Sequence, residues 1–360
     1  MIIDVVKIFI PSTISFALGI AISAVLSHYL YKYKMWKKIG GKKSLDGKAA
    51  PVFNSLHKEK EVGVPRMGGI IIWLSAFTTT VSLWLAAQLF TIDWIQKIDF
   101  LSRNQTWIPL FTLFLGSLVG LIDDFLEIRG SGDHVAGGLS LKKRLFVVSF
   151  IALLGSLWFY YKLDVTGIGL PDYFSTPEIF LGPFFILFFI AVVVFIYSGG
   201  VIDGIDGLAG GIFAIMFSAY AVIAFYQQQI NLAAFCTVLV GGILAFLWFN
   251  IPPARYYMSE TGTMGLTITL AIVAFMTDRL AEGHGVLALL FIAFPLIVTT
   301  SSNIIQMISK KFRDGKKIFL IAPIHHHFEA LGWPSYKVTM RYWVISVVFA
   351  IIGIIVALTG

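Results

Sequence analysis

Long apolar runs separated by short polar connections dominate the chain. Windows of about 20 mostly apolar residues, the length that a helix needs to cross a bilayer, lie near 8–31, 67–90, 107–127, 144–163, 178–197, 207–226, 231–250, 262–280, 285–308 and 340–358. The pattern predicts an all-α polytopic membrane protein with about ten transmembrane helices, in a single integral-membrane domain over residues 1–360. The first run has no basic leader and no Ala-x-Ala cleavage site, so we expect it to be retained as a span.

Composition supports this interpretation. Hydrophobic residues make up 58% of the chain and charged residues only 13%, which exceeds the apolar share of ordinary soluble domains. A net charge of +7 can indicate nucleic acid as a partner, but the charges are distributed around the spans. We therefore expect the lipid bilayer as the main partner and no nucleic acid. The single cysteine, Cys236, excludes a disulfide framework and a cysteine metal site.

The basic residues predict an orientation. Of the 27 Lys and Arg residues, 22 fall in the loops after odd-numbered spans. Because cytoplasmic loops are enriched in Lys and Arg, these loops are predicted to be cytoplasmic and both termini external, in the inner membrane. The longest such loop, 32–66, is interpreted either as an anchor for anionic headgroups or as a substrate-binding segment. In the second interpretation Lys60 is the candidate substrate-binding residue.

An acidic pair, Asp123-Asp124, closes the third apolar run. Ionisable residues at membrane depth cost several kcal/mol unless they are solvated or paired, so the pair is a functional candidate. We expect the two carboxylates to reach water at the helix end, and a merely solvated helix end is the alternative. Adjacent helical residues point about 100° apart, which favours one metal ligand and one separate base or nucleophile.

A second acidic element follows the fifth run. Asp203 and Asp206 stand in a glycine-rich block, 203–209, and at i and i+3 they are predicted to share a helix face. Such carboxylates suit Mg²⁺ or a nucleotide. The pattern is neither a Walker loop nor a dinucleotide fingerprint. Close helix packing is the alternative, and it explains the glycines but not both acids.

Two further elements lie in odd-numbered loops. Glu260 is predicted to lie in the turn between the seventh and eighth windows, where a charge stabilised by the helix dipole is the alternative. His325, His326 and His327 stand in the last cytoplasmic loop. Metal sites usually need spaced ligands, so hydrogen bonds to a diphosphate are favoured, with interfacial histidines of no special role as the alternative. Together the four elements predict one cytoplasmic site that holds a divalent cation against phosphate groups.

At these residues the chain resembles the phospho-N-acetylmuramoyl-pentapeptide transferase family, within the polyprenyl-phosphate hexosamine-1-phosphate transferases. The similarity covers nearly the whole chain and is carried by 65–69, 123–124, 203–209, 246–250 and 323–333. The Pro-Ile-His-His-His block followed by Gly-Trp-Pro is the most specific part. Glu260 stands where the family has Asp, and Tyr197 and Gly200 stand where it usually has Asn.

The resemblance implies a membrane enzyme that moves phospho-N-acetylmuramoyl-pentapeptide from its uridine diphosphate carrier to undecaprenyl phosphate with Mg²⁺, and it allows a homodimer. It implies Asp123, Asp124, Glu260 and His325 as catalytic residues, with Asp123 as base or nucleophile. The metal ligands that it implies are Asp124, Asp203 and Glu260. Substrate binding is assigned to Lys60, Asp203, Asp206, His326 and His327.

Three other functions are alternatives: a related transferase for another UDP-sugar, an ion-coupled transporter and a non-catalytic homologue that binds lipid phosphates. Transporters tend to place charges near the bilayer midplane and to show paired halves, whereas these acids lie at span ends and no halves repeat.

Overall fold

The computed structural model describes residues 2–38, 41, 55, 62–130, 138–171, 174 and 176–359. Its first elements are α1 (Ile2–Lys32), α3 (Ile70–Leu89), α4 (Asp93–Ile98), α5 (Trp107–Arg129), α6 (Leu141–Lys162), β1 (Gly167–Gly169), β2 (Glu178–Phe180), α7 (Phe184–Ser198) and η1 (Gly199–Ile202). They are followed by α8 (Leu208–Tyr226), α9 (Ile230–Asn250), α10 (Ser259–Met276), η2 (Arg279–Ala281), α11 (Gly285–Ile292), α12 (Phe294–Phe312), α13 (Ile324–Ala330) and α14 (Ser335–Leu358).

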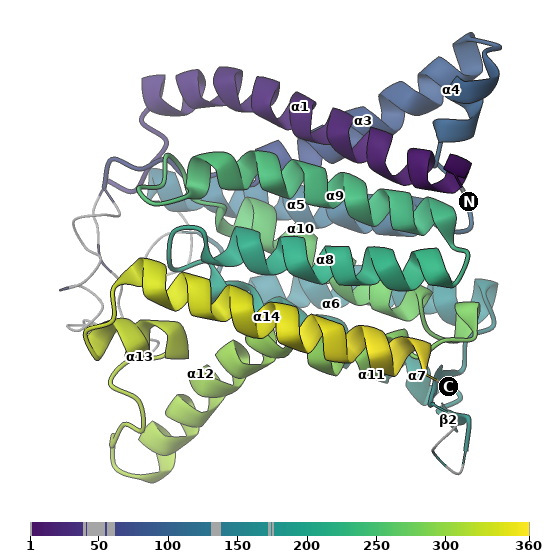
Figure 1. Cartoon of the computed structure of the whole chain (residues 1–360). Coiled ribbons are helices and arrows are strands. Elements are labelled where there is room, and N and C mark those ends of the chain that lie inside the picture. The colour runs from purple at the N-terminus through teal and green to yellow at the C-terminus, as the bar shows by residue number, and fades with distance from the viewer. Residues whose placement is uncertain are drawn as a thin grey trace.

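The long helices run side by side in one bundle (Figure 1). Within the described residues, nine helices are long and apolar enough to cross a membrane, or up to ten if a bent pair is counted as one span. The chain ends, marked N and C, lie at the same end of the bundle, as an even number of crossings requires. The predicted all-α polytopic architecture is confirmed.

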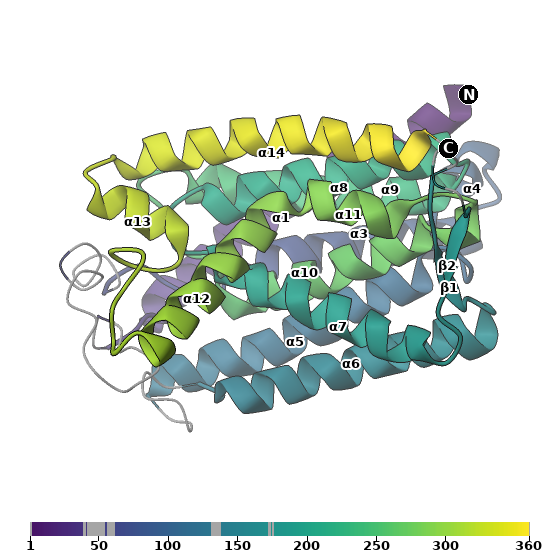
Figure 2. The ribbon, with the colours of Figure 1, turned by 90° about the horizontal axis from the view of Figure 1, so that it is seen from below.

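Helix α10 lies inside the bundle, between α5, α7 and α8 (Figure 2). All its residues except Glu260 are buried. Gly116 and Gly120 of α5 face it so closely that a Cβ atom on Gly120 would collide with the Glu260 carbonyl. Small residues four apart let two helix backbones approach in this way. The contact fixes the end of α5 beside the start of α10.

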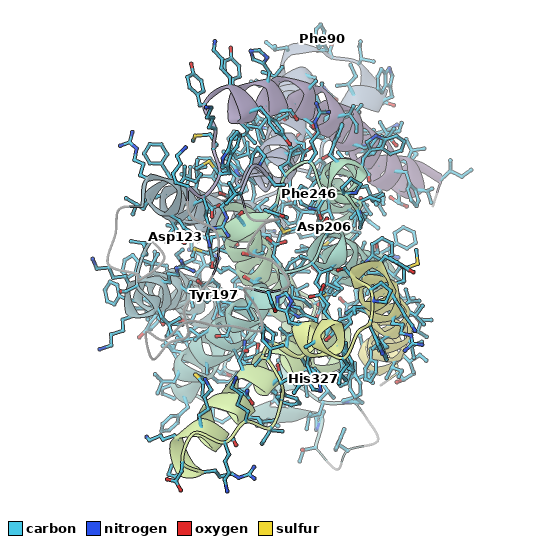
Figure 3. The ribbon with its side chains drawn as sticks, turned by 90° about the vertical axis from the view of Figure 1, so that its left-hand side faces the viewer. Phe90, Asp123, Tyr197, Asp206, Phe246 and His327 are labelled. Carbon is cyan, nitrogen blue, oxygen red and sulfur yellow. The ribbon has the colours of Figure 1, made fainter. Side chains whose placement is uncertain are left out.

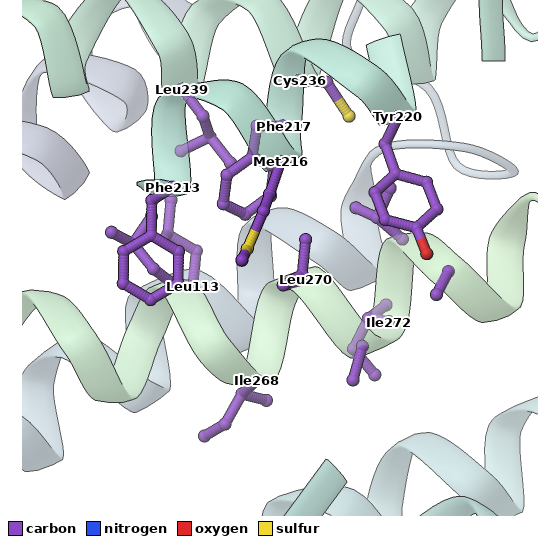
Figure 4. Close-up of a cluster of buried hydrophobic side chains, with 14 of the residues drawn as sticks. Leu113, Phe213, Met216, Phe217, Tyr220, Cys236, Leu239, Ile268, Leu270 and Ile272 are labelled. Atoms are coloured by element: carbon purple, nitrogen blue, oxygen red, sulfur yellow. The ribbon is translucent and has the colours of Figure 1, made fainter. Parts of the chain in front are cut away.

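Large apolar side chains fill the space between α8 and α10. Met216 and Phe217 of α8 point toward Leu270 of α10 (Figure 4), and all three are fully buried. These side chains are enclosed between the two helices, and their close packing holds the helices together. Cys236 of α9 is also fully buried, so it is a packing residue.

The ninth apolar window, 285–308, is not one straight helix. It is broken at Ala293 into α11 and α12, which are bent by 67°. Beyond the break the sequence becomes amphipathic, with Ser302, Gln306 and Ser309 buried along one face of α12. This polar face binds the chain that returns from residue 316 onward, and α12 therefore leaves the bundle (Figure 1).

The fifth apolar window, 178–197, begins too early. Residues Glu178–Phe180 form β2, which pairs antiparallel with β1. The helix begins only at Phe184, after Gly182 with φ of 54° and Pro183. A positive φ suits glycine, and proline is tolerated at a helix start, so this pair ends the strand and begins α7.

Asp278 lies just after α10 at the end of the bundle that carries the chain termini. Its Oδ1 accepts a hydrogen bond from Gly169 N (2.7 Å), and Oδ2 accepts one from Val286 N (2.9 Å). The carboxyl group thus joins β1 to α11. Burial raises its pKa from 3.8 to about 6, although the N–H donors oppose the shift. A carboxyl with a raised pKa binds its proton more tightly in the folded state.

This raised pKa predicts a pH dependence of stability. Between pH 3.8 and about 6 the folded state holds a proton on Asp278 that the unfolded state has lost, so stability falls as the pH rises. We expect Asp278→Asn to remove this contribution. The difference in Tm between wild type and variant in detergent should fall as the pH is raised from 4 to 7. A difference that stays constant would contradict the assignment.

Candidate active site

The first turn of α10 receives carboxylates from two other elements. Asp124 of α5 accepts hydrogen bonds from Glu260 N (3.3 Å), Thr261 N (2.9 Å) and Thr261 Oγ1 (2.5 Å). Asp203, which follows η1, accepts one from Ser259 N (2.7 Å). A helix start has unpaired N–H groups and the positive end of the helix dipole. It therefore gathers acids that are far apart in the sequence.

Arg144 of α6 joins two of the acids on the neighbouring side. Its Nη2 lies 2.8 Å from Asp123 Oδ2, and its Nη1 lies 2.6 Å from Glu260 Oε1. Leu139 N donates a hydrogen bond of 2.5 Å to Asp123 Oδ1. Tyr197 of α7 bonds to the same guanidinium. Arg144 therefore fixes the positions of both carboxylates, and its side chain is 18% exposed.

The acidic pair does not reach water as expected. Asp123 and Asp124 are both 0% exposed, because α5 continues to Arg129 and its glycine face presses against α10. Their different directions are as predicted: Asp123 faces Arg144, whereas Asp124 faces α10. The solvated helix end is therefore excluded. Glu260 belongs to the first turn of α10 and not to the preceding turn.

Asp203 and Asp206 do not share a helix face. The helical turn η1 ends at Ile202, and the two residues belong to a loop. Asp203 reaches α10, whereas Asp206 Oδ2 accepts a hydrogen bond of 3.0 Å from Ala254 N. The i and i+3 expectation fails because the intervening glycine and the turn at residue 207 replace the helix.

Asn250, the last residue of α9, holds this loop in place. Its Oδ1 accepts a hydrogen bond of 2.9 Å from Gly207 N, and its Nδ2 donates one of 2.9 Å to Tyr256 O. One buried side chain thus ties the 203–207 loop to the segment before α10. The sequence motif at 246–250 contained this residue, but its spacing did not indicate the role.

His325 and His326 approach the same loop from α13. Both are buried, and a Cβ atom on Gly204 would lie 2.6 Å from His326 Nε2 and 2.9 Å from His325 Nε2. His326 Nδ1 bonds to Glu329 Oε2 at 2.7 Å, which leaves Nε2 directed at the loop. Figure 3 views the end of the bundle where these elements meet.

Helix α13 is positioned by the polar face of α12. Gln306 accepts hydrogen bonds from two backbone N–H groups and donates one of 2.9 Å to Phe319 O. Ser302 Oγ accepts one of 3.1 Å from Ile324 N, the first residue of α13. His327 turns away from the loop and packs edge-on against Phe319. It is therefore separated from the other two histidines.

Two imidazole rings lie so close to Gly204 that a methyl group added at this residue should disturb them. Gly204→Ala should push the imidazoles of His325 and His326 away and lower turnover by about tenfold or more, since misplacement by about 1 Å can cost 10²-fold. Gly200→Ala is the matched control, because its Cβ would make only a 3.4 Å contact with Thr263. We would measure turnover of both variants, and equal activities would contradict the proposed approach.

Most of the predicted site residues are therefore brought together. Asp123, Asp124, Asp203, Glu260, His325 and His326 form a continuous series of contacts around α10 and the 203–207 loop. Asp206 and His327 lie at its edges. Lys60 lies outside the described residues.

Arg144 was missed by the sequence analysis. A basic residue at the start of the fourth span, two residues after Lys142, looked like an ordinary cytoplasmic charge. Its only signal in the sequence was its position in the connection that follows the acidic pair.

The donor set suits a hard cation. Carboxylate oxygens are the ligands that Mg²⁺ prefers, and the four acids at the start of α10 outnumber the Arg144 guanidinium that bridges Asp123 and Glu260. Among the described residues, however, no three His, Cys, Asp or Glu side chains converge closely enough to hold a metal unaided. The metal ligands therefore stay a prediction.

Comparison with known proteins agrees with this architecture. The family model described as Glycosyl transferase family 4 matches residues 106–278. The phospho-N-acetylmuramoyl-pentapeptide-transferase of Listeria innocua serovar 6a is 34% identical over 301 residues, which cover 83% of this chain and 86% of the relative. The same-named protein of Anoxybacillus flavithermus is 33% identical over 301 residues (82% and 84%), and that of Chloroflexus aggregans is 29% identical over 362 residues (99% and 90%).

The helical bundle, its carboxylate-rich end and these similarities define an integral-membrane transferase. Within that class, the chain belongs to the phospho-N-acetylmuramoyl-pentapeptide transferase family.

Proposed function

We propose that this chain transfers phospho-N-acetylmuramoyl-pentapeptide from its uridine diphosphate carrier to undecaprenyl phosphate, which yields lipid I and UMP for peptidoglycan synthesis. Family membership supports the reaction. The observation that carries it is the meeting of Asp123, Asp124, Asp203 and Glu260 at the start of α10. Phosphoryl transfer depends on positioning and on stabilising charge, and this cluster offers both.

Mg²⁺ is the cofactor that we propose, with Asp124, Asp203 and Glu260 as the residues that would hold it. When bound, the ion would neutralise the charge that develops on the diphosphate. Asp124 and Asp203 contact consecutive residues of one helix start, which also carries Glu260. The carboxylate oxygens of Asp124, Asp203 and Glu260 therefore lie around the same helix start.

The chain's own groups would orient the reactants. Arg144 holds Asp123, which we assign to the place beside the lipid phosphate as base or nucleophile. His326, oriented by Glu329, and His325 would donate hydrogen bonds to the diphosphate. Both a single displacement and a phospho-aspartate route use this arrangement. The buried surroundings of Asp123 strengthen its electrostatic interactions.

The reaction is tested with purified protein, undecaprenyl phosphate, Mg²⁺ and a panel of UDP-sugars. We expect UMP release with UDP-N-acetylmuramoyl-pentapeptide and little with UDP-N-acetylglucosamine. Preferential turnover of another UDP-N-acetylhexosamine would identify a related transferase instead. No UMP release with any donor, from protein that is folded, would reject the transferase assignment.

We further propose that the carboxylate-rich end is cytoplasmic, since 22 of the 27 Lys and Arg residues lie in the loops on that side. Cysteines introduced at Lys42, Lys142 and Lys316 should react only with reagents that reach the cytoplasm. A cysteine at Arg103 should react from outside. The buried Cys236 should give little background. External labelling at Lys316 would reject the orientation. Lys42 lies outside the described residues.

A further inference from the structure

A pocket separate from the acidic cluster opens on α1. Its volume is about 390 Å³, and it is lined by Ala24, Ser27, His28, Tyr31, Lys32 and Arg255. The first five residues belong to the last turns of α1, and Arg255 belongs to the segment between α9 and α10. The end of α1 and this segment lie at the bundle end that carries α13 (Figure 1).

Among the described residues, the charged side chains that line this pocket are both basic. Lys32 and Arg255 contribute two cations, and His28 adds an imidazole ring. Neither Lys32 nor Arg255 forms an ion pair with a carboxylate among the residues that the structure describes. Cations that have no carboxylate beside them in a concave site attract an anion.

The pocket also contains an unsatisfied donor. Ser27 is 4% exposed, and its hydroxyl has no hydrogen-bond partner within the described part of the chain. Buried hydroxyl groups are normally hydrogen-bonded, so an acceptor oxygen inside the pocket would satisfy it. Tyr31 Oη donates a hydrogen bond of 2.9 Å to Arg255 O. This bond links the two sides of the pocket before any ligand arrives.

The depth of the pocket indicates what kind of anion it binds. Lys32 ends a helix of 31 residues that is long and apolar enough to span the membrane, so the pocket lies at headgroup level. Beside it α1 exposes Val25 (61%) and Tyr29 (50%), which offer apolar surface to acyl chains. Juxtamembrane basic residues attract anionic lipids.

We propose that this pocket binds the phosphate of an anionic membrane phospholipid. Lys32 and Arg255 would contact the phosphate oxygens, and the Ser27 hydroxyl would donate to one of them. The pocket is distinct from the acidic cluster, because none of its lining residues belongs to that cluster.

The proposal is tested by native mass spectrometry of the full chain, released from vesicles of phosphatidylglycerol and phosphatidylethanolamine. A double variant, Lys32→Gln with Arg255→Gln, should retain phosphatidylglycerol about thirtyfold more weakly, from two lost charge contacts. The matched control, Lys311→Gln with Arg313→Gln, removes two exposed charges beyond the pocket and should retain it normally. Equal losses in both double variants would reject a specific site.

A Ser27 variant and a competition with inorganic phosphate test the site further. Ser27→Ala removes only the hydroxyl and should weaken retention several-fold while the unfolding temperature changes little, whereas unchanged retention would remove Ser27 from the site. Excess inorganic phosphate should not displace phosphatidylglycerol from the wild type. Complete displacement would identify free phosphate as the occupant and overturn the lipid assignment.

Discussion

Asp123→Asn is expected to lower turnover by at least about 10²-fold, the loss that is common when a proton-transfer or charge-stabilising group is removed. Asn keeps the shape of the side chain and can still accept the hydrogen bond from Leu139 N. It lacks the charge that faces Arg144 and cannot act as base or nucleophile. The measurement is UMP release at saturating substrate. Asp124→Asn should cause a loss of at least the same size.

Asp278→Asn is the matched control for this experiment. Asp278 is also a buried carboxylate that accepts backbone hydrogen bonds, but it lies at the opposite end of the bundle. We expect nearly normal turnover from it wherever the protein is folded. Near-normal turnover in both Asp123→Asn and Asp124→Asn would remove the pair from the mechanism. Equal losses in all three variants would indicate a general effect of altering buried carboxylates.

Glu260 supports the second large expected effect. Glu260→Gln should weaken activation by Mg²⁺ about tenfold or more, because a neutral amide replaces a charged oxygen. Glu260→Asp should leave substantial activity with an altered preference between Mg²⁺ and Mn²⁺, since the shorter side chain moves the carboxylate away from Arg144 and changes the metal geometry. The measurement is rate against concentration for each ion.

The competing interpretation treats Glu260 as a charge that only stabilises the start of α10. In that case both variants would change stability by under about 1 kcal/mol, and the metal dependence would stay as in the wild type. Superimposable Mg²⁺ and Mn²⁺ curves for the three proteins would therefore exclude Glu260 from the metal site. Unfolding temperatures measured in parallel separate a loss of fold from a loss of metal activation.

The apolar pattern was sufficient to predict most of the fold, because a helix in lipid must be both apolar and about 20 residues long. The runs that became α8 and α9 were placed within a residue of their ends. Local geometry limited the rest. The break at Ala293 and the strand before α7 depend on tertiary hydrogen bonds and on turn residues, which hydropathy does not measure.

The acids of the site were found because charge is rare in such a sequence. Their partners were not found, because they depend on packing. Asp124 binds the start of α10 only because glycines let α5 approach, and Arg144 looked like any other cytoplasmic charge. Asp203 and Asp206 have different partners because they lie in a loop. The sequence pattern had predicted helical spacing there.

The composition of helix α10 affects how the chain is inserted into the membrane. It is the least apolar of the nine candidate spans, yet it is the most enclosed. A segment with Ser, Thr and Glu in its first turns partitions only weakly into lipid if it enters the bilayer without other helices beside it. We expect its entry to be assisted by helices already made, mainly α5, α7 and α8, which pack against it, with the glycines and Asp124 of α5 at the contact. A nascent chain that stops before α10 therefore carries Asp124 without Glu260 and Thr261, the residues that hold it.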